Sequence, residues 1–63
     1  MTTIINKKNY VAFTLITKKQ IWINRMMVVS VTETADEGSQ IRTFDGNYHY
    51  VTEKVDEVLK KLD

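Results

Sequence analysis

Few residues of this 63-residue chain have side chains that commonly do chemistry, and they are not grouped as in a catalyst. The only histidine, His49, lies inside a strand-like run, and there is no cysteine. A general base needs a partner and a pocket, and the sequence assigns neither to His49. The carboxylates of Asp36, Glu37 and Asp45 lie in turn-like segments, and no Gly-x-Ser-x-Gly elbow is present. We therefore expect a protein that is not an enzyme, with no catalytic residue, no cofactor and no metal site.

The aromatic side chains are candidates for binding another protein rather than for catalysis. Tryptophan, tyrosine and arginine often dominate the energetics of protein–protein interfaces. Tryptophan is also buried on average, so we expect Trp22 to belong partly to the core rather than to act as an anchor. The candidate protein-binding residues are Trp22, Arg42, Phe44, Tyr48 and Tyr50.

Charge is unevenly distributed along the chain. Residues 1–32 carry five basic residues and no acidic one, whereas residues 33–63 carry four basic and eight acidic residues, so +5 and −4 sum to the net charge of +1. Basic residues are common at the turns and edges of sheets, where they need no binding role. They also suit nucleic acid or an acidic partner, although the pI of 8.0 is below the roughly 9 of a dedicated nucleic-acid binder. These candidate contacts are Lys7, Lys8, Lys18, Lys19 and Arg25.

Length and composition predict a single domain spanning residues 1–63. A hydrophobic content of 43% argues against disorder. The chain has no signal-peptide pattern and no run of roughly 20 apolar residues, so we expect a soluble, cytoplasmic protein without membrane insertion. A core of this size is marginal and has no disulfide to support it. The fold must therefore rely on good packing, on self-association or on a partner.

Turn-like clusters around Gly38 and Gly46, and a polar break at residues 18–20, divide the chain into strand-like runs. In the first run Val11, Phe13 and Leu15 alternate with more polar residues, which is typical of a half-buried strand. The predicted elements are a leader or extra edge strand (1–8), an antiparallel sheet (9–51) with runs at 9–16, 20–34, 40–44 and 47–51, and a helix (52–62). Because 20–34 is too long for one strand, we expect a break or bulge near residues 24–26.

The last segment has the pattern of an amphipathic helix. Val55, Val58, Leu59 and Leu62 recur at i, i+3, i+4 and i+7, and Thr52 is the expected N-cap. So short a helix must dock on the sheet to persist. The sequence predicts an α+β fold: a four- to five-stranded twisted antiparallel sheet, or a small half-barrel, packed by one C-terminal helix.

The hairpin around residues 45–46 admits two registers. A two-residue Asp-Gly turn places Tyr48 and Tyr50 on the same face as Ile41, in the core. A three-residue turn that includes Asn47 shifts the pairing by one residue and turns both tyrosines outward, together with the arginine and the phenylalanine of the hairpin. We expect a core position for at least one of the tyrosines.

Several short motifs are spaced along residues 16–62. They are Ile16-Thr17, Ile21-Trp22-Ile23-Asn24, Met27-Val28, Val31, Ile41-x-Thr43-x-Asp45-Gly46, Val51-x-Glu53 and Glu57-Val58, followed by the apolar Leu59 and Leu62. In this stretch the chain resembles the small flagellar-operon proteins of the FlbD/SwrD type, and it is also similar to part of a LytTR-type DNA-binding domain. The first resemblance implies strands, an Asp-Gly hairpin and a terminal helix, with an accessory role in motility.

These observations favour a small non-enzymatic module that binds a protein of a bacterium or of a phage host. It would act through an exposed sheet edge or through an aromatic face. Three alternatives stay open: a nucleic-acid-binding regulator that uses the basic half, a motility accessory protein, and a homo-oligomer joined through the aromatic face.

Overall fold

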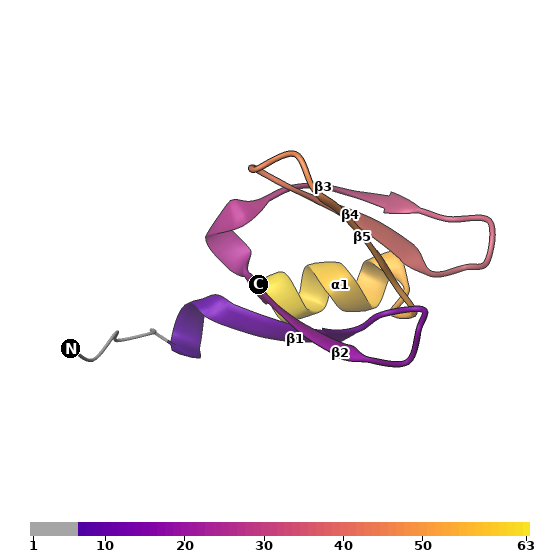
Figure 1. Cartoon of the computed structure of the whole chain (residues 1–63), viewed down its shortest axis with the longest axis horizontal. Coiled ribbons are helices and arrows are strands. Elements are labelled where there is room, and N and C mark those ends of the chain that lie inside the picture. The colour runs from indigo at the N-terminus through magenta and orange to yellow at the C-terminus, as the bar shows by residue number, and fades with distance from the viewer. Residues whose placement is uncertain (1–6) are drawn as a thin grey trace.

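The computed structural model of the chain describes residues 7–63 (Figure 1). The predicted α+β class is confirmed, with the strands of this part divided between two antiparallel sheets. Of the predicted leader over 1–8, residues 1–6 lie outside the described residues, and a short 3-10 helix begins at Lys7 where an edge strand was an option. The elements are η1 (Lys7–Asn9), β1 (Tyr10–Thr14), β2 (Gln20–Asn24), η2 (Arg25–Met27), β3 (Val28–Glu33), β4 (Ser39–Thr43), β5 (Tyr48–Val51) and α1 (Val55–Leu62).

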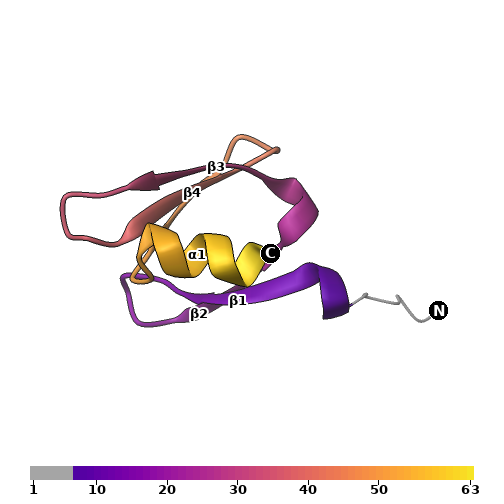
Figure 2. The same cartoon turned by 180° about the vertical axis from the view of Figure 1, so that it is seen from behind.

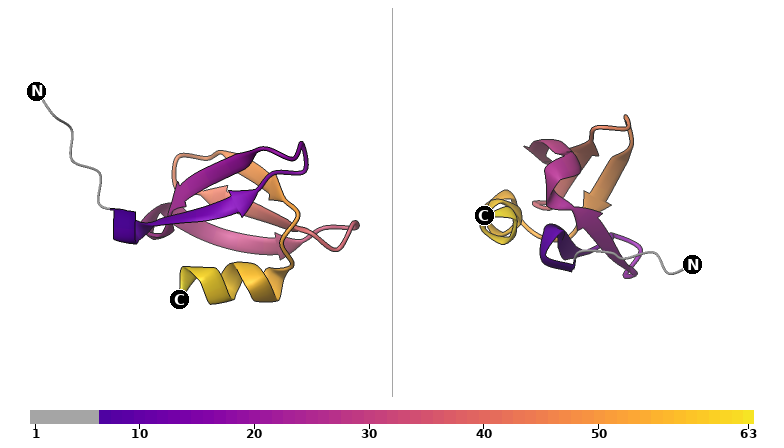
Figure 3. Two further views of the ribbon diagram at one scale, coloured as in Figure 1. Left: turned by 90° about the horizontal axis from the view of Figure 1, so that it is seen from below. Right: turned by 90° about the vertical axis from the view of Figure 1, so that its left-hand side faces the viewer.

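The two sheets meet at one corner. β1 and β2 form one sheet and β3, β4 and β5 form the other, in that spatial order. Leu15 and Val51 form an antiparallel bridge between them, and the N–H of Thr52 donates to the carbonyl of Thr14 at 2.8 Å. Figure 2 shows the two sheets with α1 between them, and the end-on view in Figure 3 places the helix to one side. The arrangement encloses a small core.

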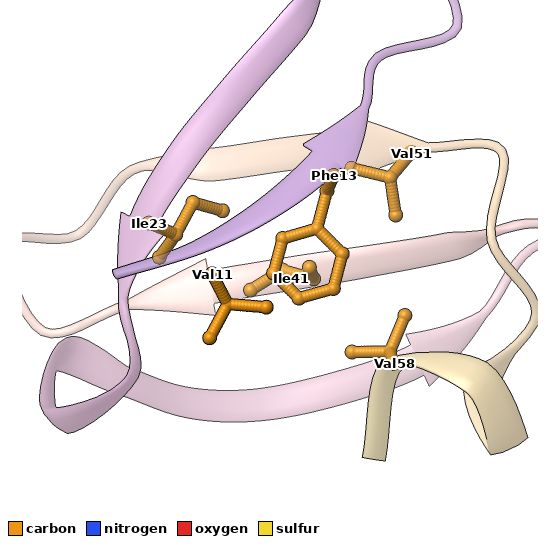
Figure 4. Packing of buried hydrophobic residues seen from close by; sticks show 6 residues of the cluster. All are labelled: Val11, Phe13, Ile23, Ile41, Val51 and Val58. Carbon is orange, nitrogen blue, oxygen red and sulfur yellow. The ribbon is translucent and has the colours of Figure 1, made fainter. Parts of the chain in front are cut away.

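The core takes apolar side chains from both sheets and from α1 (Figure 4). The predicted alternation of the first strand is confirmed, because its odd-numbered residues point inward. The helix stripe is narrower than predicted, since Leu59 is 54% exposed. The buried cluster is Val11, Phe13, Ile23, Ile41, Val51 and Val58.

The helix begins later than its sequence pattern suggests. Lys54 occupies the N-cap position and makes no side-chain capping bond, so Thr52 is not the N-cap. The reason is that Thr52 continues the strand pairing with β1. The next residue, Glu53, is 8% exposed, and its carboxylate accepts the N–H of Thr14 with both oxygens at 3.0 Å. Backbone pairing with β1 therefore extends to Thr52, and the side chain of Glu53 continues the contact up to the N-cap.

Lys61 ties the last turn of α1 to β1. Its Nζ lies 3.5 Å from a carboxylate oxygen of Glu53 and donates to the carbonyl of Ala12 at 3.0 Å. The same ammonium lies 5.5 Å from the centre of the Phe13 ring, within the range of a cation–π interaction. One side chain thus links the helix, the edge of β1 and the core.

The predicted break in the long second run is confirmed. The 3-10 helix η2 follows β2, and the side chain of Asn24 caps it by accepting the N–H of Met26 at 2.9 Å. A second irregularity follows in β3, where the pairing with β4 shifts between Val28 and Ser30. The bulge leaves Val29 unpaired, and this residue is 57% exposed.

All three hairpins close with the same kind of turn. In the last one the N–H of Thr43 donates to the carbonyl of Asn47 at 3.0 Å, and the residue before Asn47 has a positive φ. The other two hairpins repeat this hydrogen-bond pattern. The third residue of each loop is left-handed: Lys18 with φ 76°, Glu37 with φ 67° and Gly46 with φ 89°. Only one of these positions has the glycine that such a conformation favours.

The two non-glycine positions yield a stability prediction. Lys18→Gly and Glu37→Gly should each raise the free energy of unfolding by about 0.5–1 kcal/mol, because relief of the left-handed strain of roughly 1–2 kcal/mol exceeds the added chain entropy of glycine. Urea denaturation of each variant measures the change. A lower urea midpoint in both variants would contradict the turn assignment.

Candidate functional site

The β4–β5 hairpin turns its aromatic side chains outward. Ile41 pairs with His49 and Arg42 pairs with Tyr48, so even-numbered residues lie on the outer face. The loop contains three residues, 44–46, whereas the three-residue alternative from the sequence placed Asn47 in the loop. Whether the three-residue loop spans 44–46 or 45–47, the even-numbered residues of the hairpin lie on its outer face and the odd-numbered ones on its inner face. We call the outer set the aromatic face; it consists of Arg42, Phe44, Tyr48 and Tyr50.

Exposure confirms the outward position of the aromatic rings. Tyr48 is 52% exposed, Tyr50 is 45% exposed and Phe44 is 79% exposed. The expectation that one of the tyrosines belongs to the core is therefore wrong. The physical reason is the register, because the inner face of this hairpin is filled by Ile41 and Val51, which are 0% and 1% exposed.

Polar contacts orient two of these rings. The guanidinium carbon of Arg42 lies 5.7 Å from the centre of the Tyr48 ring, which sits directly across the strand pair. The side-chain amide of Gln40 donates to the Tyr50 hydroxyl at 3.0 Å. Such contacts reduce the rotamer freedom that a side chain would lose on binding. The face therefore offers two oriented rings and an arginine on hydrogen-bonded strands.

Exposed apolar residues continue from this face towards η2. The N–H of Phe44 donates to the carbonyl of Met27 at 2.7 Å, so the β4–β5 loop lies beside η2. Met26 is 77% exposed and Met27 is 38% exposed, and the exposed bulge residue Val29 follows two residues later in β3. Met26, Met27 and Val29 were not among the predicted binding residues, because a 3-10 turn between strands has no periodic pattern in the sequence. The adjacent methionines in a strand break were the available signal, since methionine is common at adaptable binding surfaces.

Trp22 is exposed but lies on the other sheet. It pairs with Ala12 on β1 and is 61% exposed, so the prediction of a partial core position is wrong. The cause is the strand alternation, which turns Ile21 and Ile23 inward and sends Trp22 outward. The five candidate protein-binding residues thus divide into the four of the aromatic face and Trp22 on β2.

A shallow pocket of about 180 Å³ separates β2 from the β4–β5 hairpin. The half-buried ring of His49 is part of its wall, together with the carboxylate of Asp45. The pKa of Asp45 is held below its ordinary value of 3.8, chiefly because the Thr43 hydroxyl donates to it at 2.5 Å and the backbone N–H of Asn47 at 3.2 Å. The complete lining is Ile21, Trp22, Ile23, Asn24, Met27, Thr43, Asp45, Asn47 and His49.

The lowered pKa of Asp45 predicts a pH-dependent contribution to stability. The ionised carboxylate supports the hairpin loop at pH values above 3.8, and this support is lost as the pH falls through the lower pKa of the folded state. Asp45→Asn should therefore lower the melting temperature at neutral pH and have a smaller effect near pH 2. Thermal melts of both proteins across this range test the prediction, and an equal difference at all pH values would contradict it.

The candidate basic contacts do not form one patch. Two groups lie at opposite ends of the β1–β2 hairpin: Lys7, Lys8 and Arg25 at one end, and Lys18 and Lys19 at the other. Arg25 also has a structural role. Its guanidinium donates to the backbone oxygen of Leu62 at 3.4 Å and to that of Asp63 at 3.2 Å. This is the favourable place for a cation at the negative end of the α1 dipole.

Residues 7–63 contain no cluster of three or more histidine or carboxylate side chains that could hold a metal ion. In the same part of the chain, α1 is the longest helix and is too short and too polar to cross a membrane. Compared with family models, with curated proteins and with solved structures, the chain matches none of them.

Proposed function

We propose that this protein is a small non-enzymatic module that binds another protein through its aromatic face. The observation that carries the proposal is the outward register of the β4–β5 hairpin, which displays Tyr48, Tyr50 and Phe44 beside Arg42. Tyrosine and arginine are enriched among the residues that dominate interface energies. The two tyrosine rings stand on paired strands, and Phe44 stands in the loop whose backbone is hydrogen-bonded to Met27, which lowers the entropy cost of binding.

The distribution of apolar side chains supports the same proposal. Among the described residues, nine large hydrophobic side chains are exposed, whereas six hydrophobic residues form the buried core. Folding alone does not account for this surplus, because exposed apolar patches on small proteins usually mark an interaction site. The aromatic face and the neighbouring methionines hold most of it.

A triple variant, Phe44→Ser with Tyr48→Ser and Tyr50→Ser, tests the proposal. It should fold with a melting temperature close to that of the wild type, because none of the three rings is buried. Affinity capture from the native host followed by mass spectrometry should recover a partner with the wild type and lose it with this variant.

The matched control removes exposed apolar groups elsewhere. Ile16→Ser with Leu59→Ser changes side chains that are 61% and 54% exposed and lie outside the aromatic face. This control should retain the captured partner. Unfolding of the triple variant, or equal recovery by all three proteins, would refute the aromatic face as the binding surface.

The proposal includes a cellular setting. The partner is a cytoplasmic protein of a bacterium or of a phage host, and the resemblance to flagellar-operon proteins supports a search that begins with motility proteins. The separation of the basic residues into two groups gives a nucleic-acid role less support than one continuous basic patch would give.

A further inference from the structure

We propose that the free edge of β2 is a second contact site, which takes an extended acidic segment of a partner protein by strand addition. The proposal goes beyond the aromatic face, because it concerns the other sheet and rests on different observations. These are the unpaired backbone of β2, the absence of acidic residues from its hairpin and the pocket that flanks it.

The backbone of β2 is unpaired on one side. Among the described strands, β2 pairs only with β1. The N–H of Leu15 donates to the carbonyl of Lys19 at 2.7 Å, so these two residues are a hydrogen-bonded pair. Along an antiparallel ladder such pairs alternate with pairs whose N–H and C=O groups point away from the partner strand. Residues of β2 that bond to β1 are then the odd-numbered ones, so the N–H and C=O groups of Gln20 and Trp22 point away from β1. They form a template for another strand.

The corresponding groups of β1 are already occupied. The carbonyl of Ala12 accepts the ammonium of Lys61, the N–H of Thr14 donates to Glu53, and the carbonyl of Thr14 accepts the N–H of Thr52. The edge of β1 is therefore closed at Ala12 and Thr14 by α1 and by the segment that leads into it.

The edge of β3 carries features that discourage pairing. The bulge at Val29 interrupts its ladder, and a carboxylate stands at its end on Glu33. Bulges and charges are the usual means of protecting an exposed edge. β2 has no bulge, no proline and no charged residue between Gln20 and Asn24. The edge of β5 already contacts the end of β1, because the carbonyl of Tyr50 accepts the N–H of Ile16 at 3.0 Å beside the Leu15–Val51 bridge. Of the four edges, that of β2 is the best suited to accept a strand.

Charge selects an acidic segment over a second copy of this chain. Lys18 and Lys19 precede β2 and Arg25 follows it, and residues 7–32 contain no acidic side chain. Antiparallel pairing of two β2 strands centred on Trp22 would place Lys19 of one copy opposite Arg25 of the other. Like charges opposite each other destabilise a strand pair, whereas acidic residues near both ends of an added strand would be attracted.

The pocket beside β2 supplies a place for alternate side chains of the added strand. Its wall combines the apolar groups of Ile21, Ile23 and Met27 with polar groups of the β4–β5 hairpin. The carboxylate of Asp45 is among them, so the pocket takes neutral side chains from the middle of the added strand and the acidic residues belong at its ends. At about 180 Å³ this shallow pocket has room for a small side chain such as that of threonine or valine. In strand addition the backbone provides affinity and such pockets provide selectivity.

Two synthetic peptides test the proposal: acetyl-Glu-Thr-Val-Thr-Val-Thr-Glu-amide and the same sequence with lysine at both ends. Trp22 is the only tryptophan, so its fluorescence reports directly on this strand. The acidic peptide should shift the emission to shorter wavelength and bind at least about tenfold more tightly than the lysine peptide. Amide NMR shifts should concentrate in residues 20–24. Absence of binding at millimolar acidic peptide, or equal binding of the two peptides, would overturn the proposal.

A proline on each edge provides the matched pair of variants. Gln20→Pro removes an outward N–H and leaves the ladder to β1 intact, and Glu33→Pro does the same on β3. Affinity for the acidic peptide should fall at least about tenfold in the first variant and stay unchanged in the second. The reverse result would assign the site to β3 and overturn the proposal. If Gln20→Pro does not fold, the NMR shifts of the wild type decide, and shifts centred on residues 28–33 overturn it.

The triple serine variant of the aromatic face separates the two proposals. It should still bind the acidic peptide with wild-type affinity, even though it loses the captured partner. Loss of peptide binding in that variant would show that the peptide occupies the aromatic face and would overturn the β2 site.

Discussion

The Phe13→Ala variant is expected to be largely unfolded at 25 °C. Phe13 is 1% exposed and lies between the two sheets among the other core residues (Figure 4). Removal of a buried phenylalanine costs about 3–5 kcal/mol. A domain of this length has a total stability of roughly 3–9 kcal/mol at the usual 0.05–0.15 kcal/mol per residue. The variant also loses the ring beneath the Lys61 ammonium. Loss of near-ultraviolet circular dichroism and of NMR dispersion would record the unfolding.

Phe44→Ala is the matched control, because it makes the same chemical change at a residue that is 79% exposed. Its free energy of unfolding should stay within about 0.5 kcal/mol of the wild type. Similar losses of stability in the two variants would contradict the division between the core and the aromatic face.

Gly38→Ala is expected to destabilise the protein by about 2–3 kcal/mol, near the upper end for overpacking. Gly38 is buried, and a Cβ there would lie too close to the carbonyl oxygen of Val51. Gly38 immediately precedes β4 and Val51 ends β5, and both clashing atoms are fixed to the backbone, so neither can rotate away. Relief would require β4 and β5 to separate, which would disturb the corner where Val51 meets Leu15. Urea denaturation measures the loss.

Gly46→Ala distinguishes steric strain from conformational strain. A Cβ at Gly46 would have no neighbour within 4 Å, but φ is +89°. The expected cost is about 1 kcal/mol, from the left-handed backbone alone. If Gly46→Ala destabilised the protein more than Gly38→Ala, the close packing of Gly38 against β5 would be wrong.

The order of elements could be predicted from the sequence because local patterns determine it. The alternation around Phe13 required a strand, and the length of the second run required the break at Asn24. The stripe that includes Val58 required a helix that packs on the sheet. The start of that helix could not be predicted, since it depends on a tertiary contact, the pairing of Thr52 with β1.

The candidate site was harder to predict, because a shift of the strand pairing by one residue moves every side chain of that strand to the opposite face of the sheet. The Asp-Gly pair at 45–46 suits both a two-residue and a three-residue turn, so sequence pattern did not fix the direction of Tyr48. In the structure the loop has three residues and the third, Gly46, has the left-handed backbone conformation that glycine adopts readily. The same turn occurs at Lys18 and Glu37, where no glycine in the sequence indicates a left-handed residue.

Site-specific photocrosslinking is the most direct test of the claim that the aromatic face binds a partner. A benzoylphenylalanine is placed at position 48 or at position 59 in the otherwise native chain. Tyr48 and Leu59 have nearly equal exposures, 52% and 54%, but Leu59 lies on α1, which packs on the inner side of the sheets. Irradiation in the native host should give one defined adduct from position 48 and none from position 59. No adduct from position 48, or the same adduct from both, would contradict the account.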